Sequence, residues 1–501
     1  MARTSPGKHP FRMGLLDLGI VVVYLIGITL FGLRFRKKQR SLKDYFLADK
    51  SIPWWAISLS IVAAETSTLT VISVPGLAYD KNFAFLQLVL GYLVGRVVIS
   101  FLLIPHYFRG DLFTAYQLIE RRFGKNLRSL TAGLFLITRA AAEGVRIFAV
   151  AIVVGIALSS FLGGFSEFGR DVTAIGIVTV LTLIYTFEGG MAAVIWTDVI
   201  QTSIYVIGTI VGFFTILHLV PGGWSTVSEM ARDAGKFRVF DFSWDFYKTY
   251  TFWSGLIGGA FLTTASHGTD QLIVQRLLAA KTMRQSQLAL LASGVAVFFQ
   301  FGLFLMIGAM LFVFYKLFPP LVAFSKTDRV FPTFIVTRMP HGVSGLLIAA
   351  ILAAAMSNLS AALNSLSSTT ILDFYARFRP GVAELRLMVL SRMATVAWGT
   401  VLFVLAIVSR SGGKVVELGL GIASVAYGAL LGVFLLGVLT KRATESGAMA
   451  GMLCGFAANV YLWQFTKVPF TWYVALGSIL TFVVGYMSSW LFSRTASTGA
   501  L

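Results

Sequence analysis

Long apolar runs separated by short polar loops follow one another along almost the whole chain. Most of them contain about 20 residues or more, the length that an α-helix needs to cross the hydrocarbon core of a bilayer. We therefore expect an all-α polytopic membrane protein. The pattern predicts 13 spans, at residues 14–33, 54–79, 84–107, 127–161, 171–187, 191–219, 250–279, 285–316, 342–372, 385–409, 415–440, 444–465 and 470–493.

The ninth span carries a row of polar side chains that lipid does not tolerate. Its central stretch, AAAMSNLSAALNSLSS (353–368), repeats hydroxyl and amide groups among small apolar residues. An unpaired polar group in hydrocarbon is costly, so these side chains must face protein, water or an ion. The stretch indicates a solute or ion pathway, and the alternative is close helix packing through small residues.

Two spans combine helix breakers with groups that can bind a ligand. The second span holds AAETSTLT (63–70) and then Pro75-Gly76, and the seventh holds Gly258-Gly259 and then TTASHGTDQ (263–271). Each of the two opens a set of five spans, as an inverted repeat requires, and broken helices in such transporters bind ions and substrate near the bilayer midplane. We therefore divide the chain into five parts. These are an N-terminal helix with a basic loop (1–53), a first repeat (54–219), a loop (220–249), a second repeat (250–440), and two C-terminal helices with a tail (441–501).

The charged residues agree with a membrane protein and exclude nucleic-acid binding. The net charge is +19, but only 13% of the residues are charged, and Lys and Arg gather in short loops at 34–50, 106–128, 276–284 and 373–392. These loops fall on one side if every span crosses once, and the positive-inside rule makes that side cytoplasmic. We expect a cell (inner) membrane protein with its N-terminus outside and its C-terminus in the cytoplasm. Nucleotide-binding loops, metal-ligand clusters and nucleophile motifs are absent from the sequence, so an enzyme is not expected.

Four segments resemble the sodium:solute symporter family. They are DYFLADKSIPWW (44–55), EGGMAAVIWTDVIQ (188–201), TDQLIVQR (269–276) and GLLIAAILAAAMSNLSAALNSLSSTTILDFY (345–375). Within the family, the likeness is closest to the bacterial sialic acid carriers. The resemblance implies a LeuT-like fold, in which two inverted repeats of five helices (5+5) carry two broken helices. One extra helix precedes the repeats and two follow, which reproduces the 13 spans.

The resemblance also implies sodium sites. The site that the family shares would use the backbone carbonyls of Ala63, Thr66 and Ala354 with the side chains of Ser357 and Asn358. The family usually has a hydroxyl where this chain has Asn358, whose longer amide alters the cavity. Neutral oxygens suit a sodium ion that must be released in each cycle.

A second sodium, which some members carry, would use Asp198, Ser357 and Ser360. Ala361 stands where the family has another hydroxyl, so that site lacks one ligand. A buried carboxylate is costly unless it is compensated, so Asp198 is an ion ligand, a coupling carboxylate or the partner of a basic residue.

Substrate residues are predicted in both breaks and in the fourth span. Relatives that bind acids hold a carboxylate with hydroxyls at the positions of Ser67, Thr68 and Thr70, with Ser73 following, and with an arginine in the fourth span. At the position of that arginine this chain has Glu143, with Arg139 and Arg146 on the same helix face, or these three form an internal salt-bridge network. Glu65 could bind a substrate amine or pair with Arg139 or Arg96. His267 and Asp270 are candidates in the second break.

We interpret the sequence as that of a secondary active transporter, which couples sodium entry to uptake of a small polar organic solute. A simple hexose is less expected, because the Glu-Gln pair of the sugar carriers is replaced by Leu69-Thr70, and the hydroxyls of the break favour a carboxylate-bearing solute such as an acidic sugar, organic acid or amino acid. Na+ is the only ion expected. The expected partners are the solute, sodium and the lipid bilayer, without nucleic acid, and the protein is expected to work as a monomer. The alternatives are a proton-coupled or uncoupled carrier, or a transporter-like solute sensor.

Overall fold

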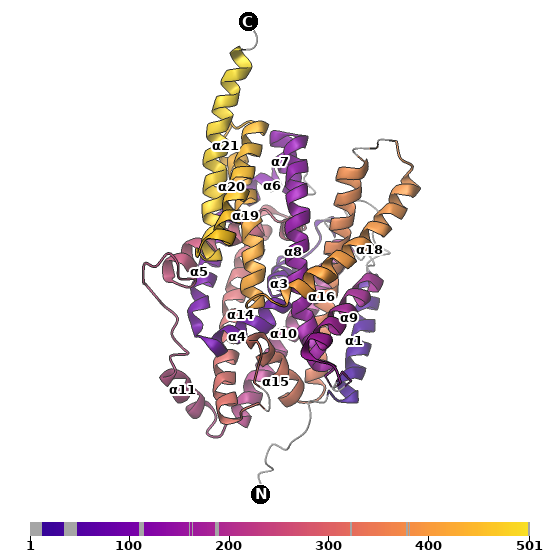
Figure 1. The fold of residues 1–501 in the computed structure, drawn as a ribbon, viewed down its shortest axis with the longest axis vertical. Coiled ribbons are helices and arrows are strands. Elements are labelled where there is room, and N and C mark those ends of the chain that lie inside the picture. The colour runs from indigo at the N-terminus through magenta and orange to yellow at the C-terminus, as the bar shows by residue number, and fades with distance from the viewer. Residues whose placement is uncertain are drawn as a thin grey trace.

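The computed structural model places the chain in a bundle of helices that run side by side (Figure 1). It describes residues 13–34, 48–109, 115–159, 161–162, 164–185, 190–320, 323–376, 379 and 381–498, and these residues form no strand. The long helices are α1 (Leu15–Leu33), α5 (Leu86–Val98), α8 (Lys125–Ala157), α9 (Glu167–Tyr185), α10 (Gly190–Leu219), α14 (Met283–Leu317), α16 (Val343–Ser368), α18 (Glu384–Ser409), α19 (Val415–Leu439), α20 (Glu445–Phe465) and α21 (Tyr473–Thr498). Most of the predicted basic loop 34–50, and parts of 106–128 and 373–392, lie outside the described residues.

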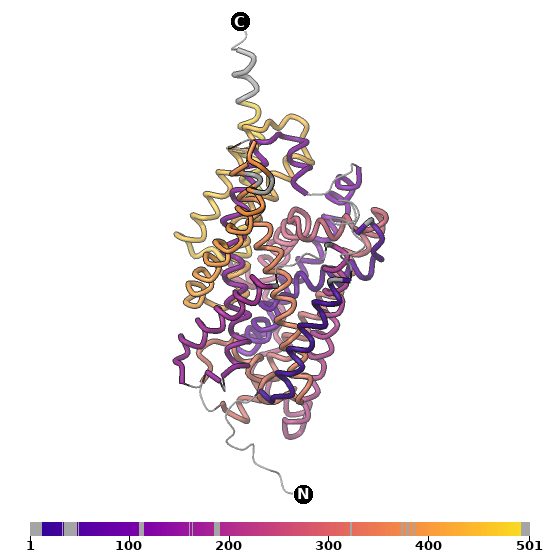
Figure 2. Tube along the Cα trace, turned by 90° about the vertical axis from the view of Figure 1, so that its right-hand side faces the viewer, coloured from indigo at the N-terminus to yellow at the C-terminus, as the bar shows by residue number. Residues whose placement is uncertain are grey.

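The helices cover all of the predicted spans within the described residues. Among the residues that the structure describes, nine helices are long and apolar enough to cross a membrane by themselves, and a bent pair makes a tenth. The protein is therefore a polytopic helical membrane protein, while the number of 13 crossings stays a prediction. The first helix, α1, begins at one end of the bundle, and α21 runs toward the opposite end (Figure 2).

Both predicted interruptions are present, although the helix breakers do not cause them. The first separates α3 (Trp54–Glu65) from α4 (Thr68–Asp80), and the two axes differ by 63°. The second separates α12 (Gly259–Gly268) from α13 (Gln271–Leu278). The expectation that Pro75-Gly76 and Gly258-Gly259 break these spans was wrong. Pro75 and Gly76 lie inside α4, and Gly258 ends the π-helical turn η5 (Ser254–Gly258), which continues directly into α12.

The glycines instead let neighbouring backbones approach. A Cβ atom on Gly258 would lie 2.1 Å from the carbonyl oxygen of Thr471, just before α21, and one on Gly259 would lie 2.3 Å from that of Leu88 in α5. Small residues at such crossings are the usual means of packing helices in lipid, where no hydrophobic force draws helices together. Contacts of α5 with α12 and of α4 with α14 hold the two broken helices in place.

We expect Gly308→Ala to destabilise the fold and Gly302→Ala, on the same helix α14, to have little effect. A Cβ atom on Gly308 would lie 2.1 Å from the carbonyl oxygen of Pro75 in α4, whereas one on Gly302 meets no atom within 4 Å. Overpacking of this kind costs about 1–3 kcal/mol. Thermal unfolding of the two purified variants measures the difference, and equal midpoints would show that α4 and α14 do not meet in this way.

The remaining elements connect or cap the bundle. A π-turn, η4 (Ile99–Leu103), and α6 (Ile104–Phe108) extend α5, and η7 (Thr369–Tyr375) extends α16. The short helices are α7 (Ala115–Phe123), α11 (Trp224–Asp233) and α15 (Val330–Arg338), and the 3-10 turns are η2 (Ala48–Lys50), η3 (Phe83–Phe85), η6 (Thr327–Arg329) and η8 (Phe470–Trp472). The serine-rich α16 packs against α1, α8 and α10 and reaches α4, so it faces the first break.

Candidate functional site between the two broken helices

A cavity of about 210 Å³ lies between the two broken helices, α8 and α19. We call it the central cavity. Every predicted substrate residue except Thr68 and Ser73 lines it, together with one predicted sodium ligand: Glu65, Ser67, Thr70, Arg139, Glu143, Arg146, His267, Asp270 and Asn358. Three regions that are distant in the sequence, the breaks and the middle of α8, therefore meet at one place.

The sequence analysis did not select several other residues that line the central cavity. Phe85, Tyr92, Phe301 and Tyr427 supply aromatic walls, and Thr263 and Ser266 add hydroxyls from α12. An aromatic residue in an apolar span gives no local signal that separates a cavity wall from the core. Only the hydroxyls of α12, which stand in the predicted TTASHGTDQ stretch, could have been proposed.

The first break exposes backbone and hydroxyl oxygens. In the described part of the chain no backbone N–H donates to the carbonyl of Ala63 or Thr66, because the helix stops at Glu65. The Thr70 hydroxyl donates to the Glu65 carbonyl (3.1 Å), and the Thr66 hydroxyl donates to Oε1 of Gln300 (2.8 Å). The buried Thr68 hydroxyl has no hydrogen-bond partner among the described residues. The break thus presents oxygens that can ligate a cation.

A buried charge cluster joins the two breaks. Glu65 forms an ion pair with Arg96 of α5, and its Oε2 lies 3.4 Å from Nε2 of His267. The Arg96 side chain is 1% exposed and also donates to the Ser293 hydroxyl of α14 (3.3 Å). The ring of His267 contacts the Ser266 hydroxyl through Nδ1 at 2.9 Å. Of the alternatives for Glu65, the structure therefore shows the pair with Arg96, which fixes both breaks to α5.

A second cluster lies on α8. Arg146 donates to Oε1 of Glu143 at 2.9 Å, and Nη2 of Arg139 is 2.9 Å from the same oxygen as an ion pair that lacks hydrogen-bond geometry. The predicted salt-bridge network is thus present, but it is incomplete. Among the described residues, Nε and Nη2 of Arg139, Nε of Arg146 and Oε2 of Glu143 have no hydrogen-bond partner although they are buried. One carboxylate shared by two guanidinium groups leaves donors available beside the cavity.

The two remaining carboxylates of the site have partners. Oδ2 of Asp198 on α10 accepts from Arg276 of α13 (2.9 Å) and from the Ser60 hydroxyl (2.5 Å), so Asp198 is the partner of a basic residue. The side chain of Asp270 begins α13, accepting from the N–H of Leu272 (2.9 Å), and also accepts from the Tyr427 hydroxyl (2.9 Å). These contacts hold α13, the second half of the broken helix, against α3, α10 and α19.

The predicted sodium ligands of α16 are partly or wholly buried. Ala354 and Ser360 are buried, whereas Ser357 and Asn358 are partly exposed within the bundle. Asn358 lines the central cavity with Ser67 and Thr70 of the first break. The structure therefore brings α16 to the break, as a site shared between the two segments requires.

Polar contacts also close one end of the cavity region. Ser73 of α4, which was predicted among the hydroxyls of the break, donates instead to Asp328, whose other oxygen accepts from the N–H of Val415 at the start of α19 (3.3 Å). Burial raises the pKa of Asp328 above its ordinary value. The Tyr250 hydroxyl donates to Glu417 on the first turn of α19 (2.8 Å), and its ring packs against Phe85 of the cavity wall.

A solute-sized cavity between two broken helices, with freed carbonyls on one side and a serine-rich helix beside it, defines a secondary transporter. The model of the sodium:solute symporter family matches residues 45–455. The chain belongs to this family. It is a multi-pass membrane transporter rather than an enzyme, and it couples sodium to the symport of a small solute.

Two relatives and one solved structure illustrate the similarity. The chain is 28% identical to the sodium/sialic acid symporter NanT of Aliivibrio fischeri over 97% of this chain and 95% of that protein. It is 28% identical to the human sodium/iodide cotransporter over 92% of this chain and 71% of that protein. The structure of a substrate-bound, outward-open Na+-coupled sialic acid symporter superposes with a TM-score of 0.79, at 27% identity, covering 95% of this chain and 98% of that one.

Proposed function

We propose that the protein carries a carboxylate-bearing organic solute into the cell together with sodium, and that Arg139 and Arg146 hold the carboxylate. The observation that carries the proposal is that both guanidinium groups share one carboxylate, Glu143, and that Nε of each arginine and Nη2 of Arg139 donate no hydrogen bond to any described residue. A buried polar group without a partner is rare in native proteins and calls for a ligand or water. A guanidinium presents its donors in a fork that matches the two oxygens of a carboxylate.

Three further features support an acidic solute. The hydroxyl of Ser67 lines the cavity from the first break and can donate to the second side of a carboxylate, whereas Thr70 would first have to give up its hydrogen bond to the Glu65 carbonyl. Glu65, which would repel an anion, is compensated by Arg96. The relatives named above carry sialic acid and iodide, which are both anionic at neutral pH. Among carboxylated solutes, an acidic sugar also suits a cavity that combines aromatic walls with many hydroxyls.

The sodium ion is proposed to bind between the first break and α16. Its ligands would be the carbonyls of Ala63, Thr66 and Ala354 and the side chains of Ser357 and Asn358. The freed carbonyls of the break and the partly buried position of Asn358 beside it support this arrangement. A second sodium at Asp198, Ser357 and Ser360 is less favoured, because Arg276 already supplies a positive charge to Asp198.

Coupling would follow from this arrangement. A sodium ion between the break and α16 ties two segments that belong to different repeats, and so favours the conformation in which the cavity can bind solute. The remaining proposals come from the sequence. They are the five-part division of the chain, the N-terminus outside and the C-terminus in the cytoplasm, the inner membrane location, and a working monomer in lipid without nucleic acid.

Replacing Arg139 by glutamine should weaken binding of a carboxylated solute at least ~tenfold, because a hydrogen bond to a charged group is worth about 1.5–3 kcal/mol. Arg128→Gln is the matched control. Arg128 is on the same helix but 45% exposed and paired with Glu120 away from the cavity. Sodium-dependent uptake into proteoliposomes measures both variants. An unchanged Michaelis constant in Arg139→Gln, with intact membrane insertion, would contradict the proposed carboxylate site.

A further inference from the structure

Exposed aromatic side chains line one edge of the loop between α11 and the seventh span. From residue 240 to 246 every second residue is aromatic, and Phe242 and Trp244 are 62% and 74% exposed. Trp253 joins them by an edge contact with Trp244 at 5.1 Å between ring centres. We call this set the aromatic face, and it consists of Phe240, Phe242, Trp244, Phe246 and Trp253.

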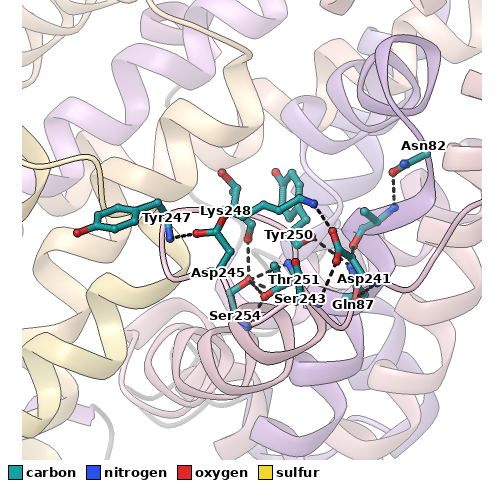
Figure 3. A network of polar contacts seen from close by, with 12 residues as sticks. Asn82, Gln87, Asp241, Ser243, Asp245, Tyr247, Lys248, Tyr250, Thr251 and Ser254 are labelled. Carbon is teal, nitrogen blue, oxygen red and sulfur yellow. Dashed lines mark hydrogen bonds and ion pairs between the residues drawn. The ribbon is translucent and has the colours of Figure 1, made fainter.

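The polar residues of the same loop alternate with the aromatic residues along the chain, and Figure 3 shows the hydrogen bonds that they make. The N–H of Asp241 donates to Gln87 of α5 (2.9 Å), and the carboxylate of Asp241 binds Lys248 and the N–H of Ser243 (3.0 Å). Asp245 accepts from the N–H of Tyr247 (2.9 Å). The hydrogen bond from Lys248 holds the pKa of Asp241 below its usual range. The contacts of Asp241 thus attach this loop to α5, while the rings of Phe242 and Trp244 remain exposed.

The aromatic face lies where three predicted spans begin. Trp253 directly precedes η5, Gln87 is in the first turn of α5, and Phe246 stacks on Trp472 just before α21, with 4.9 Å between ring centres. Figure 1 shows the loop running from α11 along the edge of the bundle toward the start of α21. Exposed apolar residues of α5 and α21, such as Val94 and Ile479, continue from this edge along surfaces that face lipid in a membrane-spanning bundle.

We propose that the aromatic face binds the interfacial region of the lipid bilayer and anchors this loop to the membrane surface. Tryptophan and other aromatic rings favour the level of the headgroups, and here they stand at the ends of spans. Lys248 is the single Lys or Arg between residues 240 and 253, and Asp241 neutralises it. The binding is therefore apolar and does not require anionic lipid. The anchored loop also carries Tyr250, which contacts Glu417 and the cavity wall.

The test uses spin labels in nanodiscs made of zwitterionic phosphatidylcholine. Cys454 is first replaced by serine. A nitroxide is then attached to Trp244→Cys, and the matched control carries it at the neighbouring polar position, Ser243→Cys. Phe242→Cys serves as a second aromatic position if Trp244→Cys does not fold. The measurements are collision rates with oxygen, which concentrates in lipid, and with a neutral nickel chelate, which stays in water.

At position 244 we expect the ratio of oxygen to nickel accessibility to be several-fold higher than at position 243. Equal ratios at the two positions, with nickel reaching both, would overturn the proposal. Both reagents could instead have low access to position 244, with dipolar broadening that grows with protein density. That result would reject the lipid contact and indicate a contact between two copies of the chain. A high ratio that arises only when anionic lipid is added would also contradict it, because the binding would then be electrostatic.

Discussion

Arg96→Met is expected to destabilise the protein by about 3–5 kcal/mol, the usual cost of removing one partner from a buried ion pair. Glu65 would remain beside the central cavity without the guanidinium that now compensates it, and His267 at 3.4 Å would be its one neighbouring basic group among the described residues. Thermal unfolding of the purified protein in detergent measures the loss.

The double variant Arg96→Met with Glu65→Gln separates charge from packing. It removes both charges, so we expect it to regain most of the lost stability. If the double variant is no more stable than Arg96→Met alone, the cost lies in lost packing of the arginine side chain, and the ion pair is not what joins the two breaks.

Ser357→Ala should raise the sodium concentration that uptake requires at least ~tenfold while leaving membrane insertion normal. Ser357 is a proposed sodium ligand on α16, and loss of one oxygen from a five- or six-ligand site should weaken sodium binding at least ~tenfold, as for other bonds to a charge. Ser368→Ala is the control, because Ser368 is exposed farther along the same helix and donates to the Ser365 carbonyl. The measurement is uptake against sodium concentration. Unchanged sodium dependence in Ser357→Ala would reject the site.

The fold could be predicted largely from the sequence because lipid imposes strong constraints. Apolar length predicts each helix, and polar groups inside apolar spans mark the places where a helix meets something other than lipid. The hydroxyl-rich stretches predicted the positions of the breaks correctly. The expectation that Pro75-Gly76 and Gly258-Gly259 interrupt the helices was wrong. Pro75 lies inside α4, and Gly258 lets the backbone of Thr471 approach, a contact that has no signature along the chain.

The site could be predicted as a list of residues but not as a set of pairs. Glu65 had two candidate arginines, and sequence spacing cannot decide between Arg96 on α5 and Arg139 on α8. Asp198 had three candidate roles, and its partner Arg276 lies 78 positions away in the chain. Local i,i+3 and i,i+4 pairs are different, because helix geometry alone brings Glu143 to Arg139 and Arg146.

Sodium-dependent binding of an acidic solute is tested most directly by thermal stability of the purified protein. The solutes are sialic acid, short monocarboxylates, amino acids and a neutral hexose, each with sodium and with potassium. A ligand specific to the native state stabilises it by about 2.7 kcal/mol at 100 times its Kd. We predict that a carboxylated solute raises the unfolding midpoint in sodium and not in potassium. Equal stabilisation in both salts, or a sodium-dependent shift with the neutral hexose alone, would contradict the account.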